Sequence, residues 1–190
     1  HRLRYTLRDA LYIAGMLNVF QRQSRMLHIA NLAQLVNVLP LIVTNDSQAY
    51  ATPIYYPFLM YRQMEPIALE AEVDSPYFSS ERLGEIEAAQ KAPYIDVSAT
   101  RSRSGRRVVL GIINRDPHRR MDLSVRLFGF GELHPARGWL LNHTDPLAEN
   151  SFEKPENVKS KEIKLRQIGN RARFTLDLPP HSVSVISLEE

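Results

Sequence analysis

The sequence predicts a mainly β protein, in which an antiparallel sandwich follows a shorter helix-rich segment. Up to about residue 65, apolar residues recur at helical spacing; beyond it, they alternate with polar residues at every second position. The alternating part contains seven or eight short runs separated by turn residues, with no helical segment between them. Short strands of this kind are typical of an antiparallel sandwich or barrel. We therefore divide the chain into residues 1–65 and 66–190.

The first part contains a clear helix, an ambiguous segment and a short helix. Residues 6–22 carry an apolar stripe and an aspartate in the first turn, which predicts a helix. Residues 26–39 form an apolar run that suits either a helix or a fully buried strand. Thr52 followed by Pro53 is a helix start signal, so we expect a short aromatic helix over 53–63.

The second part is predicted to consist of strands joined by turns. Ser-Arg-Ser-Gly at 102–105 joins two alternating runs and predicts a hairpin turn. The glutamate-rich stretch 79–90 is interpreted as a solvated loop or a turn of helix. Clear alternation predicts further strands over 94–100, 122–128, 162–166, 173–178 and 182–188.

Composition excludes several classes of partner. The chain has 190 residues, with 24 Lys and Arg against 21 Asp and Glu, and this small, dispersed surplus argues against nucleic acid. No apolar run is long enough to span a membrane, and no signal peptide is recognisable, so we expect a cytoplasmic protein. The absence of cysteine excludes disulfides and thiolate chemistry, and the six histidines lack metal-ligand spacing. We predict no metal site.

No complete catalytic apparatus is recognisable. Asp9, Asp46 and Glu65 are the acidic residues of the first 65, and none has an apparent carboxylate partner at a strand end. There is no nucleophile elbow, phosphate-binding glycine loop or dinucleotide fingerprint, so we predict no cofactor. The aromatic residues that could form a binding platform on the sandwich mostly alternate as core residues; they are Phe128, Phe130, Trp139 and Phe152.

Three amides stand at a spacing of three in "HIANLAQLVN", residues 28–37. Burying such an amide without hydrogen bonds costs about 1–3 kcal/mol, so each amide is either structural or faces a ligand. In a helix Asn31, Gln34 and Asn37 would share one stripe, whereas in a strand Gln34 would point away from the other two.

An ordered set of stretches resembles one known family. "YTLRDALYIAGMLNVFQRQS", "HIANLAQLVNVL", "TPIYYPFLMY", "YIDVSAT", "VLGIINRD", "AENSFEKPENV" and "LPPHSVSVISL" follow one another in this sequence. Together they are similar to the C-terminal part of the α-L-arabinofuranosidases of glycoside hydrolase family 51. The resemblance spans essentially the whole chain, and "ANLAQLVNV" is its most specific stretch.

The resemblance implies a two-part enzyme with a (β/α)8 barrel and a jelly-roll-like C-terminal sandwich. Residues 1–65 would be the last α/β elements of a truncated barrel: 6–22 its penultimate helix, 26–36 its last strand and 53–63 its last helix. The family releases terminal α-L-arabinofuranosyl groups from arabinan and arabinoxylan with retention of configuration, using two glutamates. Both glutamates precede the segment seen here, so the resemblance implies no catalytic residue in this chain.

The resemblance also implies a substrate contact and several partners. The glutamine of the "AQLVN" motif reaches the active-site sugar in the family, so Gln34 is the predicted substrate-binding residue. Asn31 and Asn37 are then expected to be structural. The expected partners are arabinofuranosyl-containing saccharides, the remainder of the barrel on the same or a separate chain, and further copies in a homo-oligomer. The alternative hypothesis is a non-catalytic carbohydrate-binding or oligomerisation module built on the sandwich.

Overall fold

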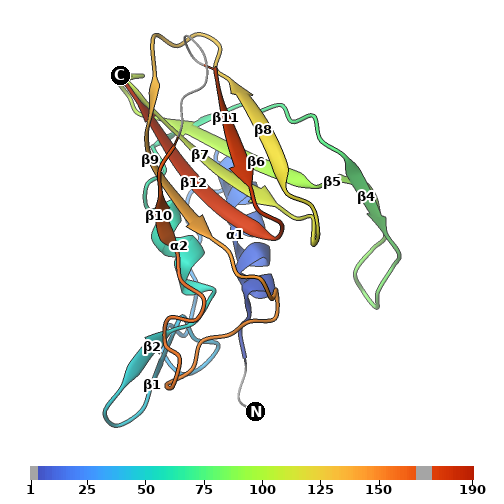
Figure 1. The fold of residues 1–190 in the computed structure, drawn as a ribbon, viewed down its shortest axis with the longest axis vertical. Helices are drawn as coiled ribbons and strands as arrows, with labels where there is room; N and C mark the ends of the chain where they lie inside the picture. The colour runs from blue at the N-terminus through green and yellow to red at the C-terminus, as the bar shows by residue number, and fades with distance from the viewer. Residues whose placement is uncertain (1–3, 166–172) are drawn as a thin grey trace.

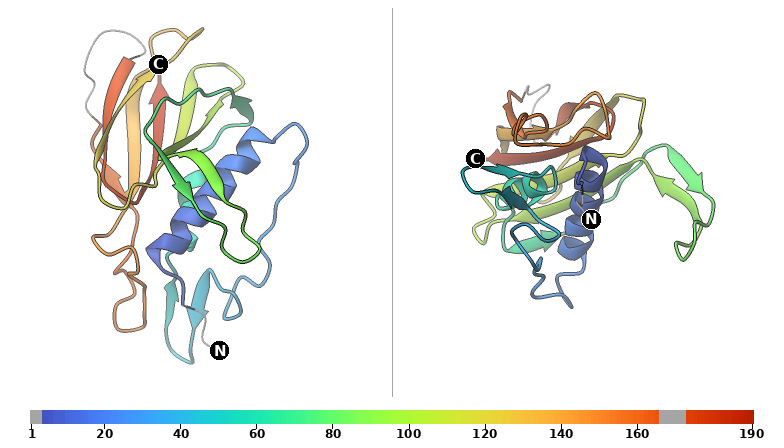
Figure 2. Two further views of the ribbon diagram at one scale, coloured as in Figure 1. Left: turned by 90° about the vertical axis from the view of Figure 1, so that its right-hand side faces the viewer. Right: turned by 90° about the horizontal axis from the view of Figure 1, so that it is seen from below.

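A six-stranded antiparallel sheet lies between two helices on one face and a two-stranded sheet on the other (Figures 1 and 2). This arrangement comes from a computed structural model that describes residues 4–165 and 173–190. The prediction of a mainly β, antiparallel fold is confirmed. In spatial order the central sheet contains β10 (Lys161–Ile163), β9 (His134–Leu141), β12 (Ser182–Glu189), β7 (Arg107–Asn114), β6 (Ile95–Arg101) and β3 (Ile67–Leu69).

Each face of the central sheet has its own apolar core. In β7, Val109 and Ile113 pack towards the helices, whereas the alternate residues Val108, Leu110 and Ile112 pack towards the two-stranded sheet. That second sheet pairs β8 (Met121–Arg126) with β11 (Arg173–Leu178). Because both faces of β7 are buried, its sequence is a continuous apolar run without alternation.

The first helix agrees with the prediction for residues 6–22. Helix α1 (Leu7–Arg22) begins after Thr6, whose backbone amide and hydroxyl both donate to the Asp9 carboxylate, each at 2.8 Å. A carboxylate in the first turn also favours the positive end of the helix dipole. Asp9 therefore serves as a capping residue.

The second helix is shorter than the predicted 53–63. Helix α2 (Tyr55–Tyr61) begins three residues after Thr52. The hydroxyl of Thr52 donates to the carbonyls of Pro40 and Leu41, at 3.0 and 3.2 Å, instead of capping the helix. Thr52 thus ties the chain before the helix to the preceding loop, and the regular helix starts later.

Most predicted strands agree with the structure to within about two residues. The strand predicted at 162–166 is the exception: β10 ends at Ile163, and residue 166 lies outside the described residues. The predicted hairpin turn is confirmed, because residues 102–106 join β6 to β7. Gly105 adopts a φ of 77° in this turn, a conformation that glycine reaches without a steric penalty.

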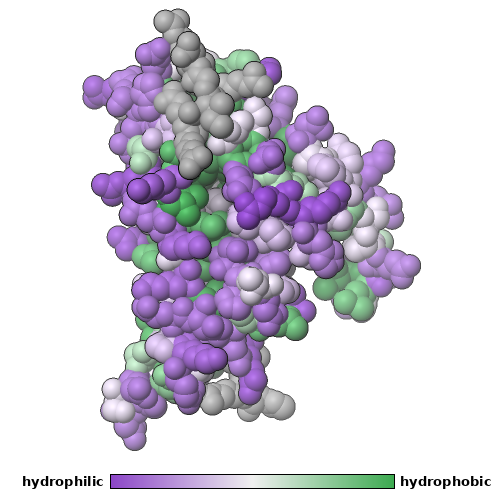
Figure 3. Space-filling model, viewed as in Figure 1, coloured by the Kyte–Doolittle hydropathy of each residue, from purple (hydrophilic) through white to green (hydrophobic). Residues whose placement is uncertain are grey.

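The interpretation of 79–90 as loop or helix is wrong at both ends of the stretch. β4 (Tyr77–Ser80) and β5 (Ala89–Pro93) pair as an arm that projects from the body (Figure 1). Its centre is exposed, as expected, and the tip carries Leu83 and Ile86, 75% and 69% exposed, which form an apolar spot in Figure 3. The alternating pattern is too short at either side of the tip for the pairing to be recognised in the sequence.

Close packing of α2 against β7 requires a glycine. A Cβ atom at position 111 would lie 2.7 Å from both the Tyr61 hydroxyl oxygen and the Met64 methyl carbon. We expect Gly111→Ala to lower the free energy of unfolding by about 1–3 kcal/mol, the usual cost of overpacking a core. The measurement is urea denaturation of the chain.

A second glycine provides the control for this prediction. Gly15 lies inside α1, and a Cβ there would meet no atom of the described residues within 4 Å. Gly15→Ala should raise the stability by about 0.5–1 kcal/mol through helix propensity. Equal effects of the two substitutions would contradict the close-packing explanation.

Candidate substrate-binding region

The segment predicted as either a helix or a buried strand is neither. Residues 27–35 have no regular secondary structure, and the segment makes a single parallel bridge, between Val36 and Ile42. The strand that the resemblance implies at 26–36 is therefore not formed in the structure of this chain. A strand forms only when a neighbouring strand accepts its backbone hydrogen bonds, and no described strand lies beside residues 27–35.

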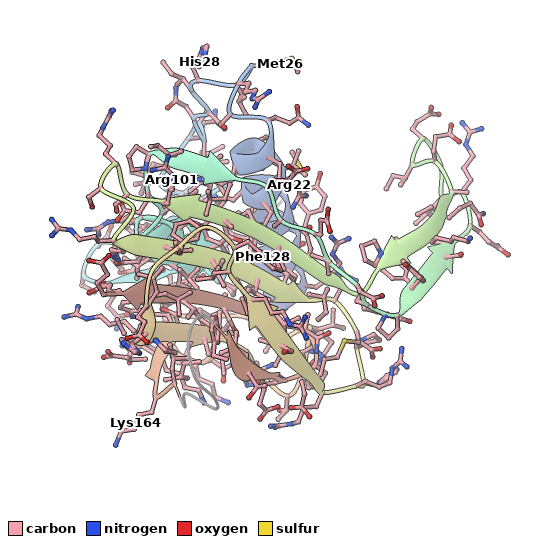
Figure 4. All side chains as sticks on the ribbon, turned by 90° about the horizontal axis from the view of Figure 1, so that it is seen from above. Arg22, Met26, His28, Arg101, Phe128 and Lys164 are labelled. Atoms are coloured by element: carbon pink, nitrogen blue, oxygen red, sulfur yellow. The ribbon has the colours of Figure 1, made fainter. Side chains whose placement is uncertain are left out.

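This segment exposes many aliphatic side chains. Figure 4 shows Met26 and His28 projecting away from the body beyond the end of α1. An apolar run that is open to solvent over this length marks a contact surface rather than a free surface. The exposed residues are Met26, Ile29, Leu32, Leu35, Val36, Val38 and Leu39, from 39% to 79%.

The three amides of this segment have different environments. The Asn37 amide donates to the Thr44 hydroxyl at 2.9 Å, and its oxygen accepts from the Thr44 backbone at 2.7 Å, as expected of a structural residue. Asn31 is exposed and makes no side-chain hydrogen bond within the described ranges, so its structural role stays a prediction. Gln34 is also exposed, and its φ of 61° is uncommon for a residue with a side chain.

The 145–158 loop of the sandwich is hydrogen-bonded to the chain at or just before the start of both helices. Backbone amides of Leu7 and Arg8 donate to carbonyls of Ala148 and Pro146, at 3.0 and 2.9 Å. The Asn150 side-chain amide donates to the Ala51 carbonyl, just before α2, at 2.8 Å. Figure 1 shows the start of α1, the β1–β2 hairpin (Ile42–Thr44 and Ala49–Ala51) and this loop together in the lower part of the molecule.

A cavity of about 300 Å³ lies between these three segments. Its wall includes Arg4 and Tyr5 before α1, Tyr50 in β2, and Glu149 and Glu153 from the sandwich loop. Arg4 pairs with Glu149 at 3.2 Å, with the Arg4 side chain 73% exposed. Burial, and secondly the nearby Asp9 carboxylate, raise the pKa of Tyr5, so its phenol remains a hydrogen-bond donor at neutral pH.

A buried polar cluster connects α1, α2 and the sheet. The amide of Asn18 donates to Asp96 at 3.1 Å, and its oxygen accepts hydrogen bonds from the hydroxyls of Tyr61 and Ser98, each at 2.6 Å. Arg22 also donates to Asp96, at 2.9 Å. Burial and then the charge of Asp96 raise the pKa of Tyr61, which keeps the phenol protonated. The cluster joins the helices firmly to β6.

Sequence reasoning missed this cluster. Asn18 lies four residues after Ala14 and eleven after Leu7, on the same apolar stripe of α1, and it is fully buried. A polar residue in the middle of an apolar stripe is the signal that would have identified it. In the alternation of 94–100, Asp96 falls on the polar face with Ser98 and Thr100, and the structure buries all three side chains.

The remaining candidates do not assemble into a second site. Glu65 pairs with Arg107, and Asp46 lies exposed in the hairpin loop. Of the aromatic residues suggested as a platform, Phe128 is 84% exposed, while Phe130 and Trp139 pack against the two cores. Phe152 contacts Tyr50 edge to face, with ring centroids 4.9 Å apart. Of the four aromatic residues suggested as a platform, Phe128 is thus the one exposed ring.

Within residues 4–165 and 173–190, no group of three or more histidine, aspartate or glutamate side chains is arranged to hold a metal ion. None of the helices in these ranges combines the length and hydropathy needed to cross a bilayer.

Comparison with known proteins shows similarity along nearly the whole chain. An intracellular exo-α-L-arabinofuranosidase from Bacteroides ovatus is 30% identical over 97% of the chain and 34% of its own length. An intracellular exo-α-(1→5)-L-arabinofuranosidase from Bacillus subtilis is 26% identical over 98% of the chain and 36% of its own length. The chain therefore spans about a third of the length of these curated relatives.

Solved structures share the fold. The α-L-arabinofuranosidase of Thermotoga maritima, in complex with arabinose, has a TM-score of 0.86 and 27% identity, covering all of this chain and 39% of that one. A thermostable family 51 α-L-arabinofuranosidase from Thermotoga petrophila gives 0.87 and 26%, over 99% of this chain and 39% of that one. The family described as the α-L-arabinofuranosidase C-terminal domain matches residues 1–182. The resemblance seen in the sequence is confirmed, and the chain belongs to this family.

Proposed function

We propose that this chain is the C-terminal part of a retaining α-L-arabinofuranosidase that releases terminal α-L-arabinofuranosyl groups from arabinan- and arabinoxylan-type saccharides. The observation that carries the proposal is the match of residues 1–182 to the C-terminal domain family, together with relatives about three times as long. The two catalytic glutamates of the retaining mechanism would lie in the part of the protein outside these 190 residues.

The exposed apolar segment, residues 26–39, supports the proposal that the rest of a barrel packs against this part of the chain. We propose that residues 1–65 complete a (β/α)8 barrel, with 6–22 and 53–63 as its last two helices and 26–36 as its last strand. A neighbouring barrel strand would supply the missing hydrogen bonds, and the barrel core would cover side chains such as Ile29 and Leu35, 76% and 51% exposed here. Residues 66–190 brace this barrel through the core shared with α1 and α2.

In this arrangement Gln34 would be the substrate contact. The C-terminal ends of barrel strands carry the active site, and Gln34 is close to the end of the proposed last strand. A side-chain amide both donates and accepts hydrogen bonds, as a sugar hydroxyl does, so it suits the arabinosyl group. The exposed Gln34 side chain is not committed to the scaffold, whereas Asn37 is bound to Thr44.

Location and assembly complete the proposal. The curated relatives from Bacteroides ovatus and Bacillus subtilis are named as intracellular enzymes, which supports a cytoplasmic location for this protein too. We propose that the sandwich also contributes to contacts in a homo-oligomer; the exposed arm of β4 and β5 is the part of it that reaches furthest from the body (Figure 1).

The test compares the full-length protein with the 190-residue chain on 4-nitrophenyl α-L-arabinofuranoside. We expect the full-length protein to release 4-nitrophenol, and NMR of the first-formed sugar to show the α-anomer, as retention requires. The 190-residue chain should give no turnover above the uncatalysed rate. The proposal fails if the full-length protein does not act on the arabinoside, and activity of the chain alone would place catalytic carboxylates within it.

A further inference from the structure

We propose that the cavity between Tyr5, Tyr50 and Glu149 is an outer subsite that binds the saccharide chain beyond the terminal arabinosyl group. This inference rests on the proposed function. It assigns to the sandwich, through its 145–158 loop, a direct role in substrate binding in addition to bracing the barrel. The cavity measures about 300 Å³, at the lower end of the range for small-molecule sites.

The position of the cavity follows from the direction of the helices. In a (β/α)8 barrel each helix begins at the face where the strands end, and that face carries the active site. The cavity is lined by Arg4 and Tyr5, just before α1, and by Tyr50 and Thr52, just before α2. With α1 and α2 as the last two barrel helices, the cavity therefore lies at the rim of the substrate face.

Part of the cavity wall is held rigidly by the fold. Asn150 is 5% exposed and uses its amide on the carbonyls of Ala51 and Val158, while its oxygen accepts from the Val158 backbone at 2.7 Å. Thr52 is bound to the carbonyls of Pro40 and Leu41. These residues shape the cavity and fix the distance between the sandwich loop and the helices, so the site is preorganised.

The groups left for a ligand suit a neutral polyhydroxylated molecule. The hydroxyl of Tyr50 has no hydrogen-bond partner among residues 4–165 and 173–190, and its ring is fixed edge-on against Phe152. The wall carries one arginine, Arg4, which pairs with Glu149, and a second carboxylate, Glu153, so it has no surplus of positive charge that would favour a phosphate or a carboxylate ligand. Sugar hydroxyls both donate and accept hydrogen bonds, so they match this mixture of phenol, guanidinium and carboxylate.

The experiment compares two substrates in the full-length protein. 4-Nitrophenyl α-L-arabinofuranoside carries one sugar, whereas α-1,5-arabinotriose extends towards an outer subsite. For Tyr50→Ala we expect the ratio of kcat/KM for arabinotriose to kcat/KM for the aryl arabinoside to fall about fivefold to tenfold, the size of one lost hydrogen bond with its packing. Tyr50→Phe keeps the ring and should lower the ratio about twofold to threefold.

The controls separate binding from folding. Tyr77→Ala removes a tyrosine from the distant β4, where its side chain is 58% exposed and does not line the cavity, and should leave the ratio unchanged. A fall in activity on both substrates by the same factor would show that Tyr50 only supports the fold, and an unchanged ratio in all variants would overturn the subsite. Absence of activity on both substrates in the unmodified protein would instead refute the proposed function itself.

Discussion

Replacing Asp96 by alanine is expected to lower the free energy of unfolding by about 3 kcal/mol, at the lower end of the range for breaking a buried ion pair. The Asp96 side chain is 9% exposed and accepts hydrogen bonds or ion pairs from Asn18, Arg22 and Arg115, at 3.1, 2.9 and 3.2 Å. The substitution leaves the Asn18 amide buried without its acceptor. Arg22 and Arg115, which are 37% and 34% exposed, would turn towards water, and this limits the loss of folding free energy.

Urea denaturation of the 190-residue chain measures this effect, and the fluorescence of its only tryptophan, Trp139, follows unfolding. Asp177→Ala is the matched control, because Asp177 pairs with Arg120 on the surface, where the side chains are 51% and 62% exposed. Surface pairs contribute about 0–1 kcal/mol. Similar losses for Asp96 and Asp177 would contradict the view that the cluster at Asn18 attaches the helices to the sheet.

Replacing Gln34 by alanine in the full-length protein is expected to lower kcat/KM for the aryl arabinoside by about tenfold to a hundredfold, with little change in stability. Removing an amide that binds a sugar hydroxyl in a water-excluded site leaves that hydroxyl without its partner, which costs about 1–3 kcal/mol of transition-state stabilisation. Gln34 is exposed, and within residues 4–165 and 173–190 its side chain makes no hydrogen bond that holds the loop, so its removal should not unfold the protein.

Steady-state kinetics and thermal unfolding of the same variants check this prediction. Asn37→Ala is the control, because Asn37 is bound to Thr44 and stands three residues away on the same segment. It should lower the melting temperature while leaving kcat/KM closer to the unmodified value. If Gln34→Ala instead lowers the stability more than the turnover, Gln34 is a scaffold residue and the substrate contact lies elsewhere.

A local sequence pattern was sufficient to predict those helices and strands whose formation depends on residues close together in the sequence. The aspartate in the first turn, Asp9, indicates the start of α1, and the alternation of 182–188 indicates the strand β12. The candidate site could not be predicted in the same way. Tyr50, Arg4 and Glu149 are separated by about 45 to 145 positions in the sequence and meet only because the sandwich loop binds the starts of both helices.

The sequence by itself determined the family, the helix at 6–22 and the antiparallel β character of the second part, whereas the role of Gln34, which the resemblance implies, stays a prediction. Only the tertiary structure decided that Asp96 is buried, that a cavity lies beside the 145–158 loop and that residues 27–35 remain without a strand. The physical reason is the range of the interactions. Periodicity and capping act between residues a few positions apart, whereas a strand, a buried charge and a cavity exist only when distant segments supply their partners.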